Sequence, residues 1–372
     1  MQTGPTESSR DVVVCCDGTW NEPRGAATNV LRVVGALSER RETSCFYHPG
    51  VGTVATTSKF TGGRRRVAAF LDGATAWSFE PRVAMAYQFI VENWRPGDRL
   101  FLFGFSRGAF AVRVVAALLH RVGLLKSQHV NLIPHLIALY RKRSGTRGDR
   151  KYWSGIEMFR NTFAVNKEGD KRSSVPVTFL GVWDTVKSVG YFTTHTYPHT
   201  DSNPSVASTR HALAIDERRA FFQPERILCK GAHQRERWFA GVHADIGGGY
   251  PHREGQLWRP PYEWVMEGAI EAGLPVDSSR ILQLPNGTEP VAEPWLERIH
   301  DSMRWYWRPA EIVLHRWFDR MTKRSRCRVG LGRRRVILPA ADIAPSVAKR
   351  ISAGVGYAPS NLPSDSDLEA EI

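Results

Sequence analysis

The stretch from Leu100 to His120 reads LFLFGFSRGAFAVRVVAALLH, and it decides the fold. Its first part, Leu100 to Phe105, is a short run rich in Phe and Leu, typical of a strand buried on both faces of a parallel sheet. The part from Gly108 to Val122 has helix length and carries Ala, Val and Leu on most sides. We therefore predict a strand, a sharp turn at Ser106 and a buried helix.

Similar apolar runs recur on both sides of this stretch, with helix-length segments between them. The other predicted strands are Asp11 to Cys16, Ser44 to Tyr47, Val175 to Trp183 and Trp238 to Val242. The other predicted helices are Asn29 to Leu37, Phe79 to Trp94 and Leu132 to Arg143. Alternation of strands and helices indicates an α/β fold, a doubly wound, mostly parallel sheet with helices on both faces.

The 372 residues are expected to form a single domain. We place its core at about residues 11 to 250 and a C-terminal helical and irregular cap at about 251 to 363, where Pro and Trp become frequent and the strand and helix rhythm fades. The tail, 364 to 372, is expected to be disordered. The polar stretch Ser188 to Ser208 is typical of a lid or binding loop.

The composition is that of a folded chain with a basic excess: 51 Lys and Arg stand against 37 Asp and Glu, a net charge of +14. No apolar stretch is long enough to cross a membrane, and Met1 to Asp11 is too polar for a signal peptide. We expect a cytoplasmic protein and leave export without a signal peptide open. Five cysteines without CxxC spacing argue against a disulfide framework or a zinc site, and no metal or cofactor is expected.

The basic residues cluster in three segments: Arg64 to Arg66, Arg141 to Lys151 and Lys323 to Arg335. Such an excess fits nucleic acid, an anionic membrane or phosphate-bearing substrate, or a merely solvated surface. Composition does not choose among them, and it leaves the oligomeric state open.

The pentapeptide Gly104-Phe105-Ser106-Arg107-Gly108 is the sharpest chemical signal. In a nucleophile elbow a Ser occupies a strained strand-to-helix turn, and small residues two positions to either side let strand and helix approach. The pentapeptide alone is common, but a strand before it and a helix after it are the required context. Ser106 is therefore the candidate nucleophile, and an inert Ser in a tight turn is the alternative.

A serine hydroxyl needs a base to take its proton, and the base needs an acid to hold its tautomer. Asp184 follows the strand FLGVW and is the candidate acid; a turn-capping Asp is the alternative. His243 follows WFAGV and is the candidate base, with Asp245 as a supporting residue in its Gly-rich loop. The competing histidines are His48, His195, His199, His233, His252 and His300.

The segment after the first strand, Cys15 to Asn21, carries the DGT motif at Asp17. This motif resembles phosphatases of the haloacid dehalogenase type, but Cys15 stands where their nucleophilic Asp would be. The alternative is an oxyanion hole made by the N–H of Arg107, after the nucleophile, and that of Gly18 or Thr19. Asp17 would then brace this loop or the His243 loop.

Several longer motifs together resemble one family. They are CCDGTWN (15–21), GGRRRVAAFLDG (62–73), YQFIVENWRPGDRLFLFGFSRGAFAVR (87–113), FLGVWDTVKSVG (179–190), RHALAIDERR (210–219), GVHADIGGGY (241–250) and YAPSNLP (357–363). The chain looks like the uncharacterised α/β-hydrolase family that includes the catalytic domain of type VI secretion phospholipase effectors. The segment from Cys327 to Arg335 is more basic than this resemblance leads us to expect, and we predict that it does not touch the catalytic residues.

The resemblance implies an α/β-hydrolase fold and a Ser-His-Asp hydrolase acting on lipid or phospholipid acyl esters, with Ser106, Asp184 and His243 in those roles. The substrate partner is then a lipid or other ester, with peripheral contact to anionic membrane through the basic clusters and no nucleic acid. The alternatives are a basic lipid-binding interaction protein and a phosphatase that uses Asp17. The aromatic run Trp305 to Trp307 is expected either to meet lipid or to cover the core.

Overall fold

The computed structural model describes most of the chain. The described residues are 9–18, 27–39, 42–50, 76–143, 149–165, 174–186, 195–228, 231–251, 254–282, 290–312, 315–319 and 324–363. Thr19, His252, the basic cluster Arg64 to Arg66 and the tail 364–372 lie outside them, as do parts of the two other basic clusters and of the segment Ser188 to Ser208.

A seven-stranded sheet forms the centre of the molecule, and every neighbouring pair of its strands is parallel. Across the sheet the strands lie in the order β11 (Asp342–Ile343), β8 (Gln234–Phe239), β7 (Val206–Ala214), β5 (Val177–Trp183), β3 (Arg99–Phe105), β1 (Asp11–Cys16) and β2 (Thr43–His48). Two small antiparallel pairs stand apart: β4 (Lys142–Arg143) with β6 (His195–Thr196), and β9 (His315–Asp319) with β10 (Arg324–Arg328).

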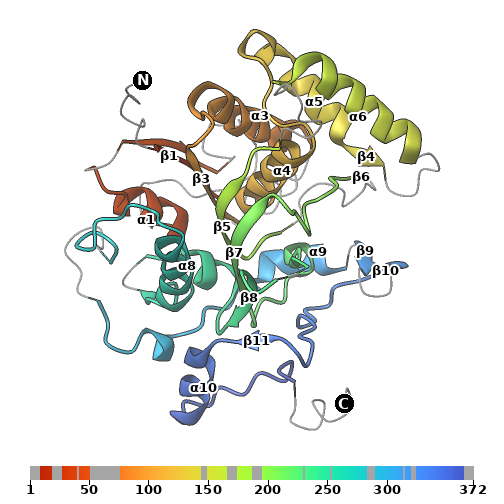
Figure 1. Ribbon diagram of the computed structural model, residues 1–372. Coiled ribbons are helices and arrows are strands. Elements are labelled where there is room, and N and C mark those ends of the chain that lie inside the picture. The colour runs from red at the N-terminus through yellow and green to blue at the C-terminus, as the bar shows by residue number, and fades with distance from the viewer. Residues whose placement is uncertain are drawn as a thin grey trace.

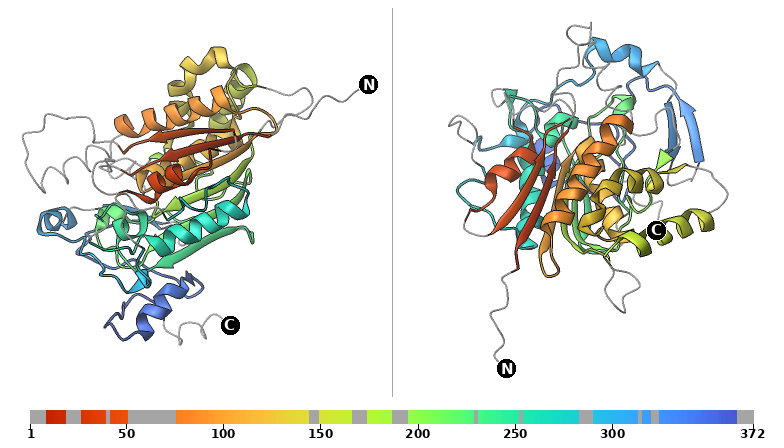
Figure 2. Two further views of the ribbon diagram at one scale, coloured as in Figure 1. Left: turned by 90° about the vertical axis from the view of Figure 1, so that its left-hand side faces the viewer. Right: turned by 90° about the horizontal axis from the view of Figure 1, so that it is seen from above.

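Helices cover both faces of this sheet (Figure 1). One face packs against α3 (Ala76–Asn93) and α4 (Arg107–Arg121), while α5 (Ile133–Tyr140) packs on α3 and α6 (Asp149–Phe163) packs on α5. The other face packs against α1 (Asn29–Ala36) and α8 (Arg259–Glu271). The turned view shows the strands sandwiched between these two helical layers (Figure 2). The predicted α/β-hydrolase-like class, a doubly wound parallel sheet, is confirmed.

The alternation of side chains along each strand explains the two layers. Val12 and Val14 of β1 face the α3 and α4 side, whereas Val13 and Cys15 face the α1 and α8 side, and all four are buried. Because both faces are covered, the strands need no polar side, which is why they read as continuous apolar runs.

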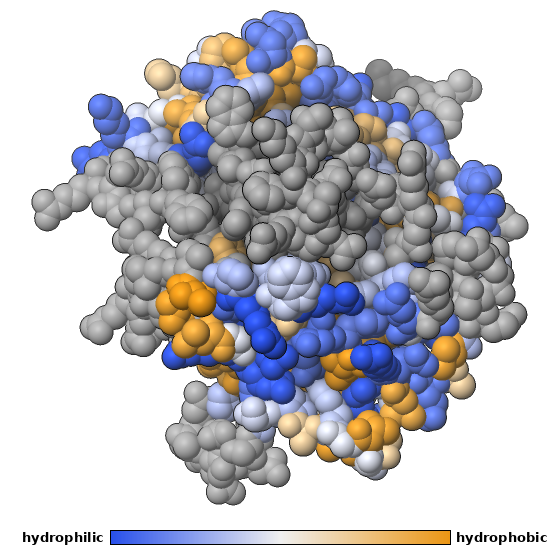
Figure 3. Space-filling model, turned by 180° about the vertical axis from the view of Figure 1, so that it is seen from behind, coloured by the Kyte–Doolittle hydropathy of each residue, from blue (hydrophilic) through white to orange (hydrophobic). Residues whose placement is uncertain are grey.

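Smaller elements follow the sheet strands or lie at the rim. They are the 3-10 helices η1 (Ser127–Leu132), η2 (Ala220–Phe222), η4 (Pro294–Leu296) and η5 (Trp305–Trp307), and the α-helices α7 (His243–Gly247), α9 (Arg308–Glu311) and α10 (Pro345–Ser352). On the rear face, hydrophilic residues dominate the lower half, and the hydrophobic ones lie in separate groups among them (Figure 3).

Two elements beyond residue 250 belong to the sheet and its helical layer. Helix α8 packs on β5 and β7, and β11 adds a strand to the sheet edge beside β8, yet both lie beyond residue 250. Strand β7, next to the centre of the sheet, begins inside the stretch expected as a lid. The sequence did not predict this strand, because Arg210 and His211 are polar residues that usually lie at the surface. Both are buried and paired, Arg210 with Glu271 and His211 with Glu236.

Candidate active site

Ser106 occupies the turn between β3 and α4, and its backbone is strained. Its φ of 57° and ψ of −124° are unfavourable for a residue with a side chain. The turn is held by backbone hydrogen bonds: the N–H of Ser106 donates to Trp183 O at 3.0 Å, and the N–H of Val186 donates to Ser106 O at 3.3 Å. Strand β5 and the residues that follow it thus hold both the N–H and the carbonyl group of Ser106.

The two glycines of the pentapeptide are required by close approaches of backbone. A Cβ on Gly104 would lie 2.6 Å from Ala109 Cα, inside the first turn of α4. A Cβ on Gly108 would lie 2.1 Å from Cys16 O, at the end of β1. The helix therefore starts in contact with two strand ends, and a side chain at either glycine would clash with backbone.

Ser106, His243 and Asp184 form a continuous chain of hydrogen bonds. Ser106 Oγ lies 2.8 Å from His243 Nε2, and His243 Nδ1 lies 2.5 Å from Asp184 Oδ2. All three side chains are buried. Because all strands of the sheet are parallel, the ends of β3, β5 and β8 meet at one edge, where sites of open α/β sheets form.

His243 begins the short helix α7 rather than ending a strand, since β8 ends at Phe239. Its ring is packed against Phe105, with ring centroids 4.6 Å apart, and against Phe222, at 4.8 Å. Gly247 brings α7 close to β3, because a Cβ there would lie 2.0 Å from the Phe105 ring. Aromatic packing and two hydrogen bonds thus fix the imidazole.

Electrostatics favour a neutral imidazole beside an ionised carboxylate. Burial lowers the pKa of His243, although the hydrogen bond and charge of Asp184 act to raise it. Burial alone would raise the pKa of Asp184, but Arg335 and His243 outweigh it and hold that pKa below its ordinary range. A neutral imidazole is the form that accepts a proton from a serine hydroxyl.

Arg335 is a site residue that sequence reasoning missed. Its guanidinium donates from Nη1 to Asp184 Oδ1 at 2.5 Å and from Nη2 to Asp184 Oδ2 at 2.9 Å. The prediction that the basic segment Cys327 to Arg335 avoids the candidate catalytic residues is therefore wrong. No local pattern marked this arginine, because it lies 151 positions from its partner.

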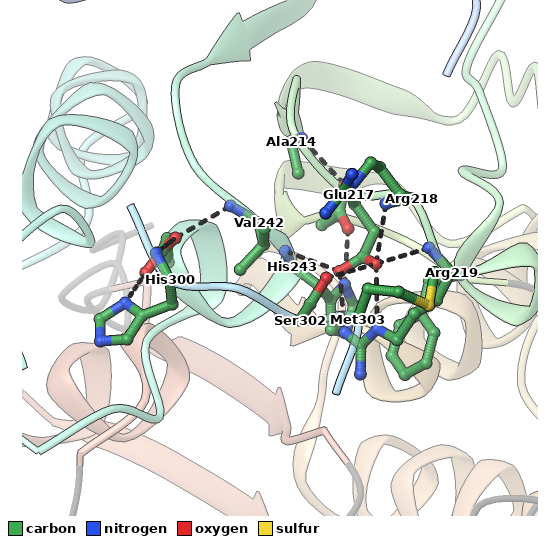
Figure 4. Close-up of polar contacts among 12 residues, drawn as sticks. Ala214, Glu217, Arg218, Arg219, Val242, His243, His300, Ser302 and Met303 are labelled. Carbon is green, nitrogen blue, oxygen red and sulfur yellow. Dashed lines mark hydrogen bonds and ion pairs between the residues drawn. The ribbon is translucent and has the colours of Figure 1, made fainter. Parts of the chain in front are cut away.

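Glu217 is a second residue that the sequence did not single out (Figure 4). It follows β7 and accepts the backbone N–H of His243 at 3.2 Å, the Oγ–H of Ser302 at 2.9 Å and three N–H groups of Arg219. Burial would raise its pKa, but Arg219 prevails and lowers it to about 2. An ionised carboxylate thus holds the backbone N–H of His243, the first residue of α7.

The predicted supporting residues brace loops. Asp17 accepts hydrogen bonds from Thr28 Oγ1 at 2.5 Å and Tyr47 Oη at 2.9 Å, so it ties the end of β1 to α1 and β2. Asp245 accepts the N–H of Val242 at 2.9 Å, directly before His243. It also contacts His300 Nδ1 at 2.6 Å, which gives that competing histidine a role in the loop (Figure 4).

Of the three residues expected to donate to the oxyanion, Arg107 has the expected position, the N–H of Gly18 already has an acceptor, and Thr19 is not described. Arg107 opens α4 directly after Ser106, as the expected role requires. The N–H of Gly18 donates to Asp17 Oδ1 at 2.6 Å, so it is engaged by its own neighbour. Thr19 lies outside the described residues.

No group of three or more His, Cys, Asp or Glu in the described part of the chain has the arrangement of a metal site. No helix among the same residues is long and apolar enough to cross a membrane.

Comparison with known proteins finds a sequence relative and similar solved structures. An uncharacterized protein, YEL023C, of Saccharomyces cerevisiae is 32% identical over 228 residues, which are 59% of this chain and 33% of that protein. A crystal structure of an uncharacterized protein from Pseudomonas aeruginosa gives a TM-score of 0.41 at 16% identity, covering 74% of this chain and 48% of that one. The Tle1 effector bound to the VgrG spike of the type VI secretion system gives 0.31 at 18% identity, covering 65% and 51%.

The chain thus spans about a third of the yeast relative and about half of each solved structure. The model of the type VI secretion phospholipase effector Tle1-like catalytic domain matches residues 10–268, which include Ser106, Asp184 and His243. Since this match covers more than half of the chain, the protein belongs to the Tle1-like phospholipase catalytic domain family, the family that its sequence motifs resemble.

Proposed function

We propose that this protein is a serine hydrolase that cleaves carboxylic esters of lipids, phospholipids foremost, through an acyl-enzyme. The hydrogen-bonded chain from Ser106 through His243 to Asp184 carries the proposal, because it joins a nucleophile, a base and an orienting acid at one sheet edge. Membership in a family of phospholipase catalytic domains supports the lipid substrate.

In the first half-reaction, Ser106 Oγ attacks the ester carbonyl carbon while its proton passes to His243 Nε2. The carbonyl oxygen becomes an oxyanion, which the N–H of Arg107 stabilises; one such donor is worth about 3 to 4 kcal/mol. Collapse breaks the bond to the alcohol oxygen, and the alcohol leaves with the proton from His243 Nε2. The product is Ser106 esterified by the acyl group.

In the second half-reaction, water attacks the acyl carbon and gives a proton to His243 Nε2. Collapse returns that proton to Ser106 Oγ and releases the carboxylic acid. Asp184 remains ionised throughout, since it stabilises the imidazolium without taking its proton. The engaged N–H of Gly18 is not assigned a role in this cycle.

The segment from Met303 to Ile312 is proposed to meet the lipid surface. Trp307 packs on Phe222 with ring centroids 5.4 Å apart, and Phe222 contacts His243, so this segment lies over the candidate site. Trp305 is 66% exposed and is flanked by the exposed Arg304 and Arg308. An exposed aromatic between cations suits an interface with anionic headgroups.

The test measures hydrolysis of a p-nitrophenyl ester and of a phospholipid panel by the wild type and by Ser106→Ala. The substitution should lower kcat on the order of 10⁴-fold or more, since it removes the nucleophile. Ser352→Ala, which removes an exposed hydroxyl at the end of α10, is the matched control and should keep wild-type rates. Equal rates for wild type and Ser106→Ala would refute the mechanism.

The same two variants separate the alternatives. If the protein only binds lipid, the wild type and Ser106→Ala should bind anionic vesicles equally well, and neither should hydrolyse an ester. A phosphatase that uses Asp17 would release phosphate with magnesium and keep that activity in Ser106→Ala. Either result would replace the proposed function.

A further inference from the structure

Arg335 reaches the candidate site from a part of the chain beyond the family match, which ends at residue 268. We propose that Arg335 is a positioning residue of the active site: its guanidinium fixes both oxygens of Asp184 and, through them, the orientation of His243 toward Ser106. The inference rests on the proposed function and deepens it. It makes the C-terminal segment part of the catalytic apparatus rather than an appended cap.

The carboxylate of Asp184 is held from three directions. Its Oδ1 accepts Arg335 Nη1 and the N–H of Ala214, at 2.5 and 3.0 Å. Its Oδ2 accepts Arg335 Nη2 at 2.9 Å and lies 2.5 Å from His243 Nδ1. Two parallel bonds from one planar guanidinium fix the rotation of a carboxylate, which a single bond does not. Without Arg335, Oδ1 would keep the Ala214 amide alone.

Arg335 is itself held in place by the loops that follow β7. Its Nη1 donates to Ala214 O at 3.0 Å, and its Nη2 also donates to Phe222 O. Asn361 Nδ2 bridges Arg335 O and Ile215 O, at 3.1 Å each. The guanidinium is buried, so its position is set by these partners and not by solvent.

The rest of the C-terminal segment is tied to the same side of the sheet. Asp216 accepts Tyr357 Oη at 2.8 Å and pairs with Arg334 at 3.2 Å. Strand β11 extends the sheet beside β8. These contacts hold Arg335 against Asp184 as part of the folded structure, and they do not depend on a bound substrate.

The charge of Arg335 has a second consequence for His243. The charged groups that face the imidazole or its acid from the packed elements are Asp184, Glu217, Arg219 and Arg335. Arg335 offsets part of the negative charge of Asp184 and so disfavours the imidazolium. Its removal would favour the imidazolium and raise the pKa of His243, so the neutral base would persist only at higher pH.

The experiment measures the rate constant for labelling of Ser106 by a fluorophosphonate across pH 4 to 9. In this reaction the Ser106 Oγ–P bond forms, the P–F bond breaks, fluoride leaves and the hydroxyl proton passes to His243. The probe reports the activated serine without requiring the natural substrate. The variants are Arg335→Met and Arg335→Lys, and the matched control is Arg333→Met, which removes the same charge from an exposed position two residues away.

We expect Arg335→Met to label at least tenfold more slowly and to move the acid limb of the profile to higher pH by about one unit. Arg335→Lys keeps the positive charge but loses the two parallel hydrogen bonds of the guanidinium. Its acid limb should therefore stay in place, while the labelling rate on the plateau falls severalfold. Arg333→Met should match the wild type in both respects. A purely structural ion pair would lower the amount of folded protein without moving the limb.

The inference is overturned if Arg335→Met has the acid limb and plateau of the wild type. Should Arg335→Met not fold, Arg335→Lys decides the question. A wild-type plateau rate in Arg335→Lys would show that the paired hydrogen bonds of the guanidinium do not orient Asp184 and His243. Failure of the proposed function looks different: the wild type then labels no faster than Ser106→Ala at any pH, and the inference falls with it. Labelling of the wild type without ester hydrolysis would leave Arg335 in place and change only the substrate.

Discussion

Gly108→Ala is the substitution whose effect the structure determines most sharply. The new Cβ would lie 2.1 Å from Cys16 O and 2.5 Å from Asp17 O, whereas ordinary contacts begin near 3.4 Å. Both are backbone atoms at the end of β1, so no side chain can rotate away. Helix α4 and the end of β1 must separate by about 1.3 Å to admit the methyl group.

Two opposing effects set the change in the free energy of unfolding that we expect for Gly108→Ala. Overpacking of this kind costs about 1 to 3 kcal/mol, and more where backbone must move. Replacing Gly by Ala inside a helix returns about 1 kcal/mol. Taking the upper value for a backbone clash, we expect a net loss of about 2 kcal/mol in the free energy of unfolding. Because Ser106 directly precedes α4, a shift of about 1 Å relative to His243 should lower kcat on the order of 100-fold.

Urea unfolding and ester hydrolysis measure the two effects. Gly35→Ala is the matched control: Gly35 lies in α1, and a Cβ there meets nothing within 4 Å. The control should gain up to about 1 kcal/mol and keep wild-type kcat. If Gly108→Ala is as stable and active as Gly35→Ala, the close approach of α4 to β1 does not set the geometry of the elbow.

Three further outcomes are expected. Burial holds the pKa of His243 below its ordinary 6.5, so the acid limb of kcat/KM for the wild type should have its midpoint below pH 6.5; a midpoint above pH 6.5 contradicts this. Glu217→Gln should lower the free energy of unfolding at pH 7 by about 3 kcal/mol. The folded pKa of Glu217 is about 2, below its ordinary 4.5, so its contribution is complete above pH 4.5 and is lost as pH falls toward 2; urea unfolding should show a smaller loss at pH 3 than at pH 7, and equal losses refute the assignment. Trp305→Ser should slow hydrolysis on anionic vesicles and leave that of a soluble ester unchanged, and an unchanged vesicle rate removes the proposed interface.

Much of the fold was readable from local patterns. The runs of Val and Phe predicted β1, β2, β3 and β5, and the glycine spacing around Ser106 predicted the turn, because these features depend on near neighbours in the chain. Strand β7 escaped prediction because its buried Arg210 and His211 look exposed in sequence. Their partners, Glu271 and Glu236, lie far along the chain.

The sequence by itself determined the α/β class, the elbow and the three candidate residues at strand ends, since apolar periodicity and turn chemistry are local properties. Only the tertiary structure decided what surrounds them: Glu217 anchors the backbone of His243, and Arg335 donates two hydrogen bonds to Asp184. These contacts join segments that are distant in the sequence and that sheet order and loop packing bring together. A basic segment whose role composition left open therefore supplies a buried arginine that contacts Asp184.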